Sequence, residues 1–210
     1  MLVQWCLKGL QLPDDAAAEH ILDSQSGLLC NWWRAVSRIS PAETRAKLTF
    51  SAADMHVNHF EDIDPATHAP FSISSPFISL SAGTVERNAA LQTNVVRRAI
   101  QTALWFGTEF GARNVAYIFR CWVVLAPRQA VEIEAMAEEV RDLNTYRRYS
   151  EYQPEGEILA KIAIPDNQIA GWEKWEIANR GHGGALSRTR FVSNPRFTPP
   201  EQLSNVKELI

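Results

Sequence analysis

The order of the expected elements predicts an α+β fold for this chain. Strand-like apolar runs dominate the second half, at 115–125, 158–164 and 169–177, and regular helices do not separate them as in a βαβ chain. One long helix, expected from about Thr84 to Phe110, and several short ones accompany these strands. With 210 residues, 46% of them hydrophobic, the chain is long enough to bury the core of one domain.

The first part of the chain is expected to contain short elements. Asp14 precedes a run of helix formers, so residues 1–28 form a helix-bearing N-terminal segment. The apolar and aromatic run 28–36 favours a strand. Ser40-Pro41-Ala42-Glu43 is a capping box with proline at the first helical position, and it predicts a helix over 41–48.

A region of low periodicity separates this helix from the next strand. Residues 50–75 contain histidines, aspartates and prolines, and they predict loops with one short strand. Residues 76–81 form a brief apolar strand, which Gly83 ends. The long helix is then expected to stop at Gly111. Its core-facing residues recur on one helix face at Leu91, Val95, Ala99, Ala103 and Phe106.

The run 115–125 is almost continuously apolar, which predicts a strand buried on both faces. A helical stretch is expected from there to about Leu143, before the strands at 158–164 and 169–177. Residues 180–210 are rich in Gly, Pro, Asn and Arg and are expected to wrap the surface as a tail. The whole chain, 1–210, is therefore interpreted as a single domain.

Composition excludes several classes of protein. The net charge of −3 argues against a nucleic-acid partner, and no apolar run is long enough to span a membrane. Residues 1–8 lack the pattern of a signal peptide, so we expect a cytoplasmic protein or one exported by a route independent of such a signal. Cys30 and Cys121 lie in apolar runs and are expected to be buried free thiols, which fits a reducing compartment. No cluster of His, Cys or Asp has metal-ligand spacing, so no metal is expected.

Two glutamates stand at the start of the run 158–164. Glu155 and Glu157 are two residues apart, and side chains at positions i and i+2 of a strand point to the same face. Both carboxylates are therefore expected in one cleft, although neighbouring carboxylates oppose each other's ionisation and cost stability. Such a pair indicates a site that binds a cation or stabilises positive charge in a reaction. The alternative is two solvated glutamates on a loop.

Four pieces of the sequence share an order with a known family. They are Trp32-Trp33-Arg34, Phe77-Ile78-Ser79-Leu80-Ser81, the run 115–125, and Glu155-Gly156-Glu157 followed by Ile164-Pro165 and Gly171-Trp172. This order resembles the mono-ADP-ribosyltransferases of the cholera-toxin type, whose pattern is Arg, then Ser-x-Ser, then Glu-x-Glu. The resemblance covers roughly residues 32–177. Two departures are Leu80, where the family usually has threonine, and Ser74-Ser75, which offers a second register.

The resemblance implies an ADP-ribosyltransferase-like fold, with two packed, mainly antiparallel β-sheets flanking an NAD cleft and peripheral helices. NAD is then a substrate, and a protein, modified on arginine, is the acceptor. Cleavage of the nicotinamide–ribose bond develops positive charge on the ribose. Glu157 is implied to stabilise this charge, and Glu155 to orient or deprotonate the nucleophile.

The resemblance also assigns residues that contact NAD. Arg34 is implied to bind the ribose or phosphate oxygens. Ser79 is implied to hydrogen-bond Glu157 and keep it aligned, and Ser81 completes the serine motif.

A histidine between the arginine and serine motifs helps to hold NAD in toxins of this type. His56, His59 and His68 all compete for this role, and His59 is taken as the candidate. Tyr149 and Tyr152 lie just before the glutamates and are expected to contact the acceptor protein.

Two other functions fit the same residues. One is hydrolysis of NAD, with water replacing the acceptor. The other is a non-catalytic binding domain, in which the aromatic residues and the basic segments Arg147-Arg148 and 188–196 serve a partner. Release of nicotinamide separates both enzymatic functions from the binding domain.

Overall fold

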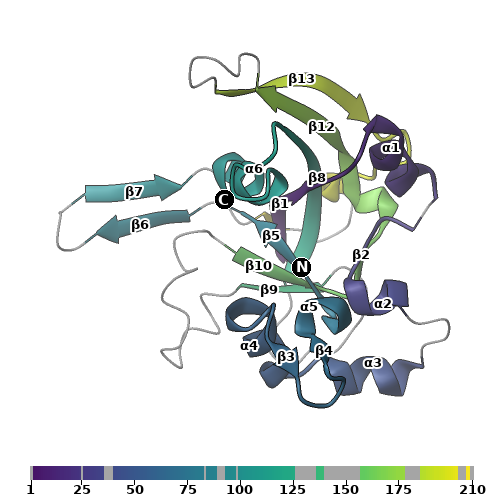
Figure 1. The fold of residues 1–210 in the computed structure, drawn as a ribbon. Helices are drawn as coiled ribbons and strands as arrows, with labels where there is room; N and C mark the ends of the chain where they lie inside the picture. Colours follow the sequence, from purple (N-terminus) through teal and green to yellow (C-terminus); the bar gives the residue numbers. More distant parts are fainter. Residues whose placement is uncertain are drawn as a thin grey trace.

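The computed structural model confirms the α+β class and builds the fold around one large sheet (Figure 1). Eight strands of the described residues form this sheet in the order β13-β12-β8-β9-β10-β5-β1-β14, and β8 also pairs with β1. The structure describes residues 2–24, 26–35, 40–82, 84–88, 93–97, 99–125, 136–139, 157–177, 185–202 and 207–208. The strands of the large sheet are β1 (Leu2–Leu10), β5 (Phe77–Ser81), β8 (Val115–Leu125), β9 (Met136–Glu139), β10 (Glu157–Lys161), β12 (Ile169–Ile177), β13 (Leu186–Ser193) and β14 (Lys207–Glu208).

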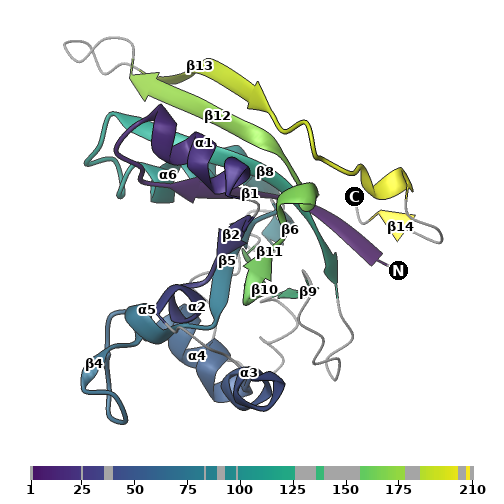
Figure 2. The ribbon, with the colours of Figure 1, turned by 90° about the vertical axis from the view of Figure 1, so that its right-hand side faces the viewer.

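The sheet has two arms that meet at β1 and β8, as Figure 2 shows. One arm holds β13, β12 and β8, which are mutually antiparallel, and β1 pairs with β8 along its whole length. The other arm holds β9, β10 and β5, again antiparallel. A single pairing of Leu7 with Ser81 joins β1 to β5. The second half of β1 and the end of β5 therefore lie next to each other, where the arms meet.

Two helices cover opposite faces of β8 because its side chains alternate. Ala116 and Ile118 pack in a cluster with α6 (Ala99–Gly107), and both are buried. Tyr117 points to the other face, where its hydroxyl donates to Asp15 of α1 (Asp15–Asp23) at 2.8 Å. The expectation that β8 is a strand buried on both faces is confirmed.

Helix capping is the sequence signal that the structure follows most closely. Asp14 accepts from the backbone N–H of Ala17 and begins α1. The predicted capping box at Ser40 and Glu43 is formed in both directions and begins α3 (Pro41–Lys47).

The segment 50–75 was expected to be loops with one short strand, and this prediction missed a helix. Thr49 accepts from the N–H of Ala52 and begins α4 (Phe50–Asn58), which buries Ala53, His56 and Val57. The helix is short and its apolar face is narrow, so its periodicity in the sequence is weak. It is followed by the paired strands β3 (Ile63–Asp64) and β4 (Ala69–Pro70) and by α5 (Phe71–Ser74).

The strand expected over 28–36 is only two residues long. β2 (Leu28–Leu29) pairs with β11 (Ala163–Ile164), and the chain then enters α2 (Asn31–Ala35). The N–H of Trp32 donates to the carbonyl of Ser75 at 3.1 Å, which directs the aromatic residues into a helix against their strand preference.

The prediction of one long helix from Thr84 to Phe110 was also wrong. Its first half is a hairpin of β6 (Thr84–Asn88) and β7 (Thr93–Arg97), and only α6 remains helical. Figure 1 shows the hairpin projecting beside α6. Of the residues expected on one helix face, Val95 lies in β7, Ala99, Ala103 and Phe106 lie in α6, and Leu91 lies outside the described residues.

Three smaller differences concern the C-terminal half. β9 lies where a helical stretch was expected, because it pairs with both β10 and β8. The strand predicted over 158–164 divides at Ile162, whose backbone φ is 64°, into β10 and β11. The expected tail contains β13, which pairs with β12, and among the described residues a 3-10 turn over 200–202 and β14 follow it. A 3-10 turn over 166–168 connects β11 to β12.

The core fills the junction of the two arms. It includes Cys6, Cys30 and Cys121, which are buried free thiols, as expected for Cys30 and Cys121. In the described part of the chain, no helix is both long and apolar enough to cross a membrane.

Candidate functional site

A cavity of about 860 Å³ opens where the two arms of the sheet meet. Its volume lies in the range of about 300–1,000 Å³ that is usual for small-molecule sites. The end of β1, β2 and α2, the end of α4, β5, the C-terminal end of α6 and the start of β10 line it. Segments that are far apart in the sequence therefore line one cavity.

The serine motif and one glutamate face this cavity together. Ser79 and Ser81 are two residues apart on β5 and share a face, and both line the cavity. Glu157 begins β10 and is the antiparallel partner of Ser81, so its carboxylate also lines the cavity. Glu155 lies outside the described residues.

His56 of α4 connects the serine motif to the protein interior. Its side chain is 7% exposed, and its two ring nitrogens lie 2.5 Å from Ser75 Oγ and 2.7 Å from Ser79 Oγ. Burial, together with the nearby positive charge of Lys8, lowers the pKa of His56 to about 3. The ring is therefore neutral at physiological pH and has one donor and one acceptor.

The tautomer of His56 sets the direction of these hydrogen bonds. Because the neutral ring has one donor and one acceptor, one of the two serine hydroxyls donates to the ring and the other accepts from it. Ser75 Oγ also accepts from the backbone N–H of Phe77 at 3.3 Å. If the ring proton is on Nε2, His56 donates to Ser79 Oγ, and His56 then does not use the hydroxyl proton of Ser79.

The other two histidines are placed differently. His59, the candidate taken from the sequence, lines the cavity but is exposed, and its Nδ1 lies 2.7 Å from Asp62. His68 follows β3 in the turn to β4, with a backbone φ of 54°. Among the three, His56 is the one that contacts the serine motif.

Lys8 is a cavity residue that the sequence analysis missed. It lies on β1, opposite Phe119 of β8, and lines the cavity. Burial lowers the pKa of its ammonium group, and the nearby carboxylate of Glu157 opposes this shift. Arg34 lowers the pKa of Lys8 further, so these three charged groups lie within electrostatic range of one another. The sequence signal that could have identified Lys8 is a charged residue in the strand-like run Gln4-Trp5-Cys6-Leu7-Lys8.

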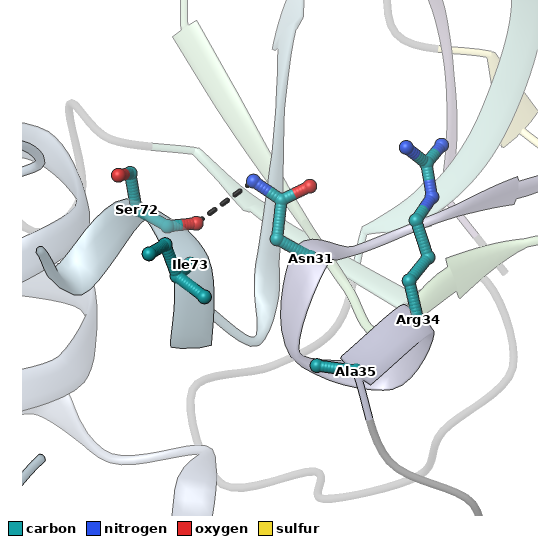
Figure 3. A pocket seen from close by; sticks show the side chains of 5 residues that line it. All are labelled: Asn31, Arg34, Ala35, Ser72 and Ile73. Atoms are coloured by element: carbon teal, nitrogen blue, oxygen red, sulfur yellow. Dashed lines mark hydrogen bonds between the residues drawn. The ribbon is translucent and has the colours of Figure 1, made fainter. Parts of the chain in front are cut away.

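Arg34 lies on α2, whereas a strand end was expected. It lines the large cavity and also a neighbouring pocket of about 340 Å³, whose other lining residues are Asn31, Ala35, Ser72 and Ile73. Figure 3 shows that the amide of Asn31 donates to the carbonyl of Ser72, at 2.8 Å, while the guanidinium of Arg34 points away from this pair. Arg34 thus brings a second cation to the cavity that contains Lys8.

Two predicted acceptor contacts, Tyr149 and Tyr152, lie outside the described residues. No group of three or more His, Cys, Asp or Glu side chains suited to a metal ion occurs within the part of the chain that the structure describes.

Comparisons with known proteins identify the fold. No protein-family model matches this chain, and no curated protein sequence matches it. Among solved structures, EcPltA matches with a TM-score of 0.52 at 14% identity, covering 94% of this chain and 89% of EcPltA. An arginine-to-lysine mutant of heat-labile enterotoxin matches with a TM-score of 0.49 at 15% identity, covering 97% of this chain and 81% of that one. The similarity to EcPltA shows the fold, which is the one that the resemblance to ADP-ribosyltransferase toxins predicts.

Proposed function

We propose that this protein is a mono-ADP-ribosyltransferase that cleaves NAD and transfers ADP-ribose to arginine of a protein acceptor. The observation that supports this most strongly is the cavity itself. It brings the carboxylate of Glu157, the hydroxyls of Ser79 and Ser81 and the cations Lys8 and Arg34 to one place. The fold that does so is also that of EcPltA.

In this proposal Glu157 supports bond cleavage. As the nicotinamide–ribose bond breaks, its electron pair leaves with nicotinamide and positive charge develops on the ribose. A carboxylate that is already in place stabilises this charge without reorganising. Glu157 is held at the start of β10 by strand pairing with β5, so its backbone is fixed before NAD binds.

The remaining charged and polar residues of the cavity bind NAD and keep the catalytic groups aligned. The pyrophosphate of NAD is anionic, and the ammonium of Lys8 and the guanidinium of Arg34 supply charge-assisted hydrogen bonds for it. His56 positions Ser79 through the 2.7 Å hydrogen bond, and in the tautomer protonated at Nε2 the Ser79 proton is left for Glu157 or for NAD. His59 was expected to contact NAD, whereas in this proposal His56 acts by positioning Ser79.

Glu155 is proposed to orient the acceptor or to take its proton, and Tyr149 and Tyr152 are proposed to contact the acceptor protein. These roles come from the resemblance of the sequence. The guanidinium group of an arginine acceptor pairs naturally with a carboxylate.

The experiment measures nicotinamide release and ADP-ribose transfer by the wild type, Glu157→Gln and Glu155→Gln. We expect Glu157→Gln to lose both reactions, because the developing charge is no longer stabilised. Glu155→Gln is expected to lose transfer and to keep part of the NAD hydrolysis, with water as the nucleophile. Asp62→Asn is a matched control for nicotinamide release in the absence of an acceptor, since Asp62 lines the cavity but pairs with His59. Equal rates in the wild type and Glu157→Gln would refute the proposal.

A further inference from the structure

Three aromatic side chains stand exposed at the C-terminal end of α6. Trp105 is 53% exposed, Phe106 38% and Phe110 59%. The ring of Phe110 contacts Trp105 and Phe106 edge-on, with centroids 5.9 and 5.5 Å apart. We call these three residues the aromatic lip. Clustered exposed aromatic residues are typical of protein interaction sites.

The backbone of the aromatic lip is strained in a way that keeps Phe110 exposed. Glu109 and Phe110 have φ angles of 54° and 58°, a conformation that is unfavourable for a bulky residue. It is held by backbone hydrogen bonds from Phe110 to Trp105 and from Arg113 to Thr108, both 2.8 Å. Burial does not offset this cost, since more than half of Phe110 faces solvent. A strained segment that exposes an aromatic ring indicates a function for that ring.

The aromatic lip lies at the cavity that contains Glu157. Phe106 and Phe110 both border this cavity, and so does the carboxylate of Glu109 between them. Glu109 pairs with Arg113 at 2.8 Å, but both side chains are about half exposed, and such pairs are weak and exchange readily.

Further carboxylates border the same cavity from the segment that follows α4. Glu61 and Asp62 are exposed there. Carboxylates and aromatic rings together favour the binding of a cationic side chain. The exposed rings also favour apolar side chains next to that cation.

We propose that the aromatic lip docks the acceptor protein, through a segment in which apolar side chains flank the arginine to be modified. The apolar side chains lie on Trp105 and Phe110, and the arginine enters the cavity toward Glu157. This inference rests on the proposed function and adds to it the chemistry of the acceptor.

The test uses two short peptides, each with one arginine, which leucines flank in one peptide and serines in the other. Agmatine, a guanidinium compound without flanking residues, is the third acceptor. The wild type is expected to modify the leucine peptide about tenfold faster than the serine peptide. Trp105→Ser and Phe110→Ser are expected to reduce this ratio to about twofold or less.

Two controls separate docking from folding and from NAD binding. Phe191→Ser removes another aromatic side chain, 50% exposed on β13, and should leave the ratio unchanged. Trp105→Ser should release nicotinamide and modify agmatine at the wild-type rate.

An unchanged ratio in both lip variants would overturn the proposal. So would a loss of nicotinamide release by Trp105→Ser without any acceptor, because the ring would then serve NAD. If the wild type releases no nicotinamide, the proposed function fails, and calorimetric titration with the same peptides still tests docking. The docking proposal is supported if the wild type binds the leucine peptide more tightly and both lip variants lose this difference. Equal binding of the two peptides by the wild type refutes the docking proposal.

Discussion

Acidification should destabilise this protein through His56. The side chain is buried, and burial together with the charge of Lys8 lowers its pKa from 6.5 to about 3. The unfolded chain binds a proton at this residue below pH 6.5, whereas the folded protein stays neutral there. The stability contributed by neutral His56 is therefore complete above pH 6.5 and is lost as the pH falls from 6.5 toward 3.

The size of this effect follows from the shift in pKa. One pH unit below 6.5 corresponds to about 1.4 kcal/mol, so the free energy of unfolding should fall by about 2 kcal/mol between pH 7 and pH 5. The full shift corresponds to about 5 kcal/mol at pH 3, where carboxylates also contribute. The interval between pH 7 and pH 5 is therefore the one that isolates the histidine.

Urea unfolding of the wild type and His56→Gln, each at pH 7 and pH 5, measures the effect. Glutamine keeps a donor and an acceptor but does not titrate, so the variant should lose most of the pH dependence. His59→Gln is the matched control, because His59 is exposed and pairs with Asp62 at the surface. It should retain the wild-type pH dependence. The reasoning is refuted if the wild type and His56→Gln lose equal stability between pH 7 and pH 5.

Three further changes test the packing and charge of the structure. Gly9→Ala should destabilise the protein by about 1–3 kcal/mol in urea unfolding, because its Cβ would lie 1.9 Å from a carbonyl oxygen of α6; an unchanged midpoint would contradict this close approach. Lys8→Met should raise the KM for NAD at least about tenfold through loss of a charge-assisted hydrogen bond, and an unchanged KM would remove Lys8 from the site. Glu173→Gln should lower the free energy of unfolding by about 3 kcal/mol, since this fully buried carboxylate lies 2.5 Å from Arg120 and 3.0 Å from Arg188. A loss below about 0.5 kcal/mol in urea unfolding would show that the two arginines contribute little to stability.

Sequence patterns predicted the elements whose signals are local. The capping box at Ser40, the aspartate before α1 and the apolar run of β8 each act on their own neighbours, and each was confirmed. Helix α2 was missed because its conformation depends on a distant partner. Trp32, for example, hydrogen-bonds to Ser75, which is remote in the sequence.

The candidate site shows the same division. Ser79, Ser81 and Glu157 were found from motif spacing, and strand pairing between β5 and β10 places them at one cavity. Lys8 was missed, and His56 was named as a competitor but not chosen, because neither belongs to a local motif. Both reach the cavity through the packing of β1 and α4, which the sequence pattern does not reveal.

The most direct test of the account is the structure of the protein bound to an NAD analogue whose nicotinamide–ribose bond cannot be cleaved. We predict that the anomeric carbon of its nicotinamide ribose lies about 3–4 Å from the carboxylate of Glu157, with the pyrophosphate against Lys8 and Arg34. An analogue bound elsewhere on the molecule, or bound in this cavity with its ribose remote from Glu157, would contradict the account.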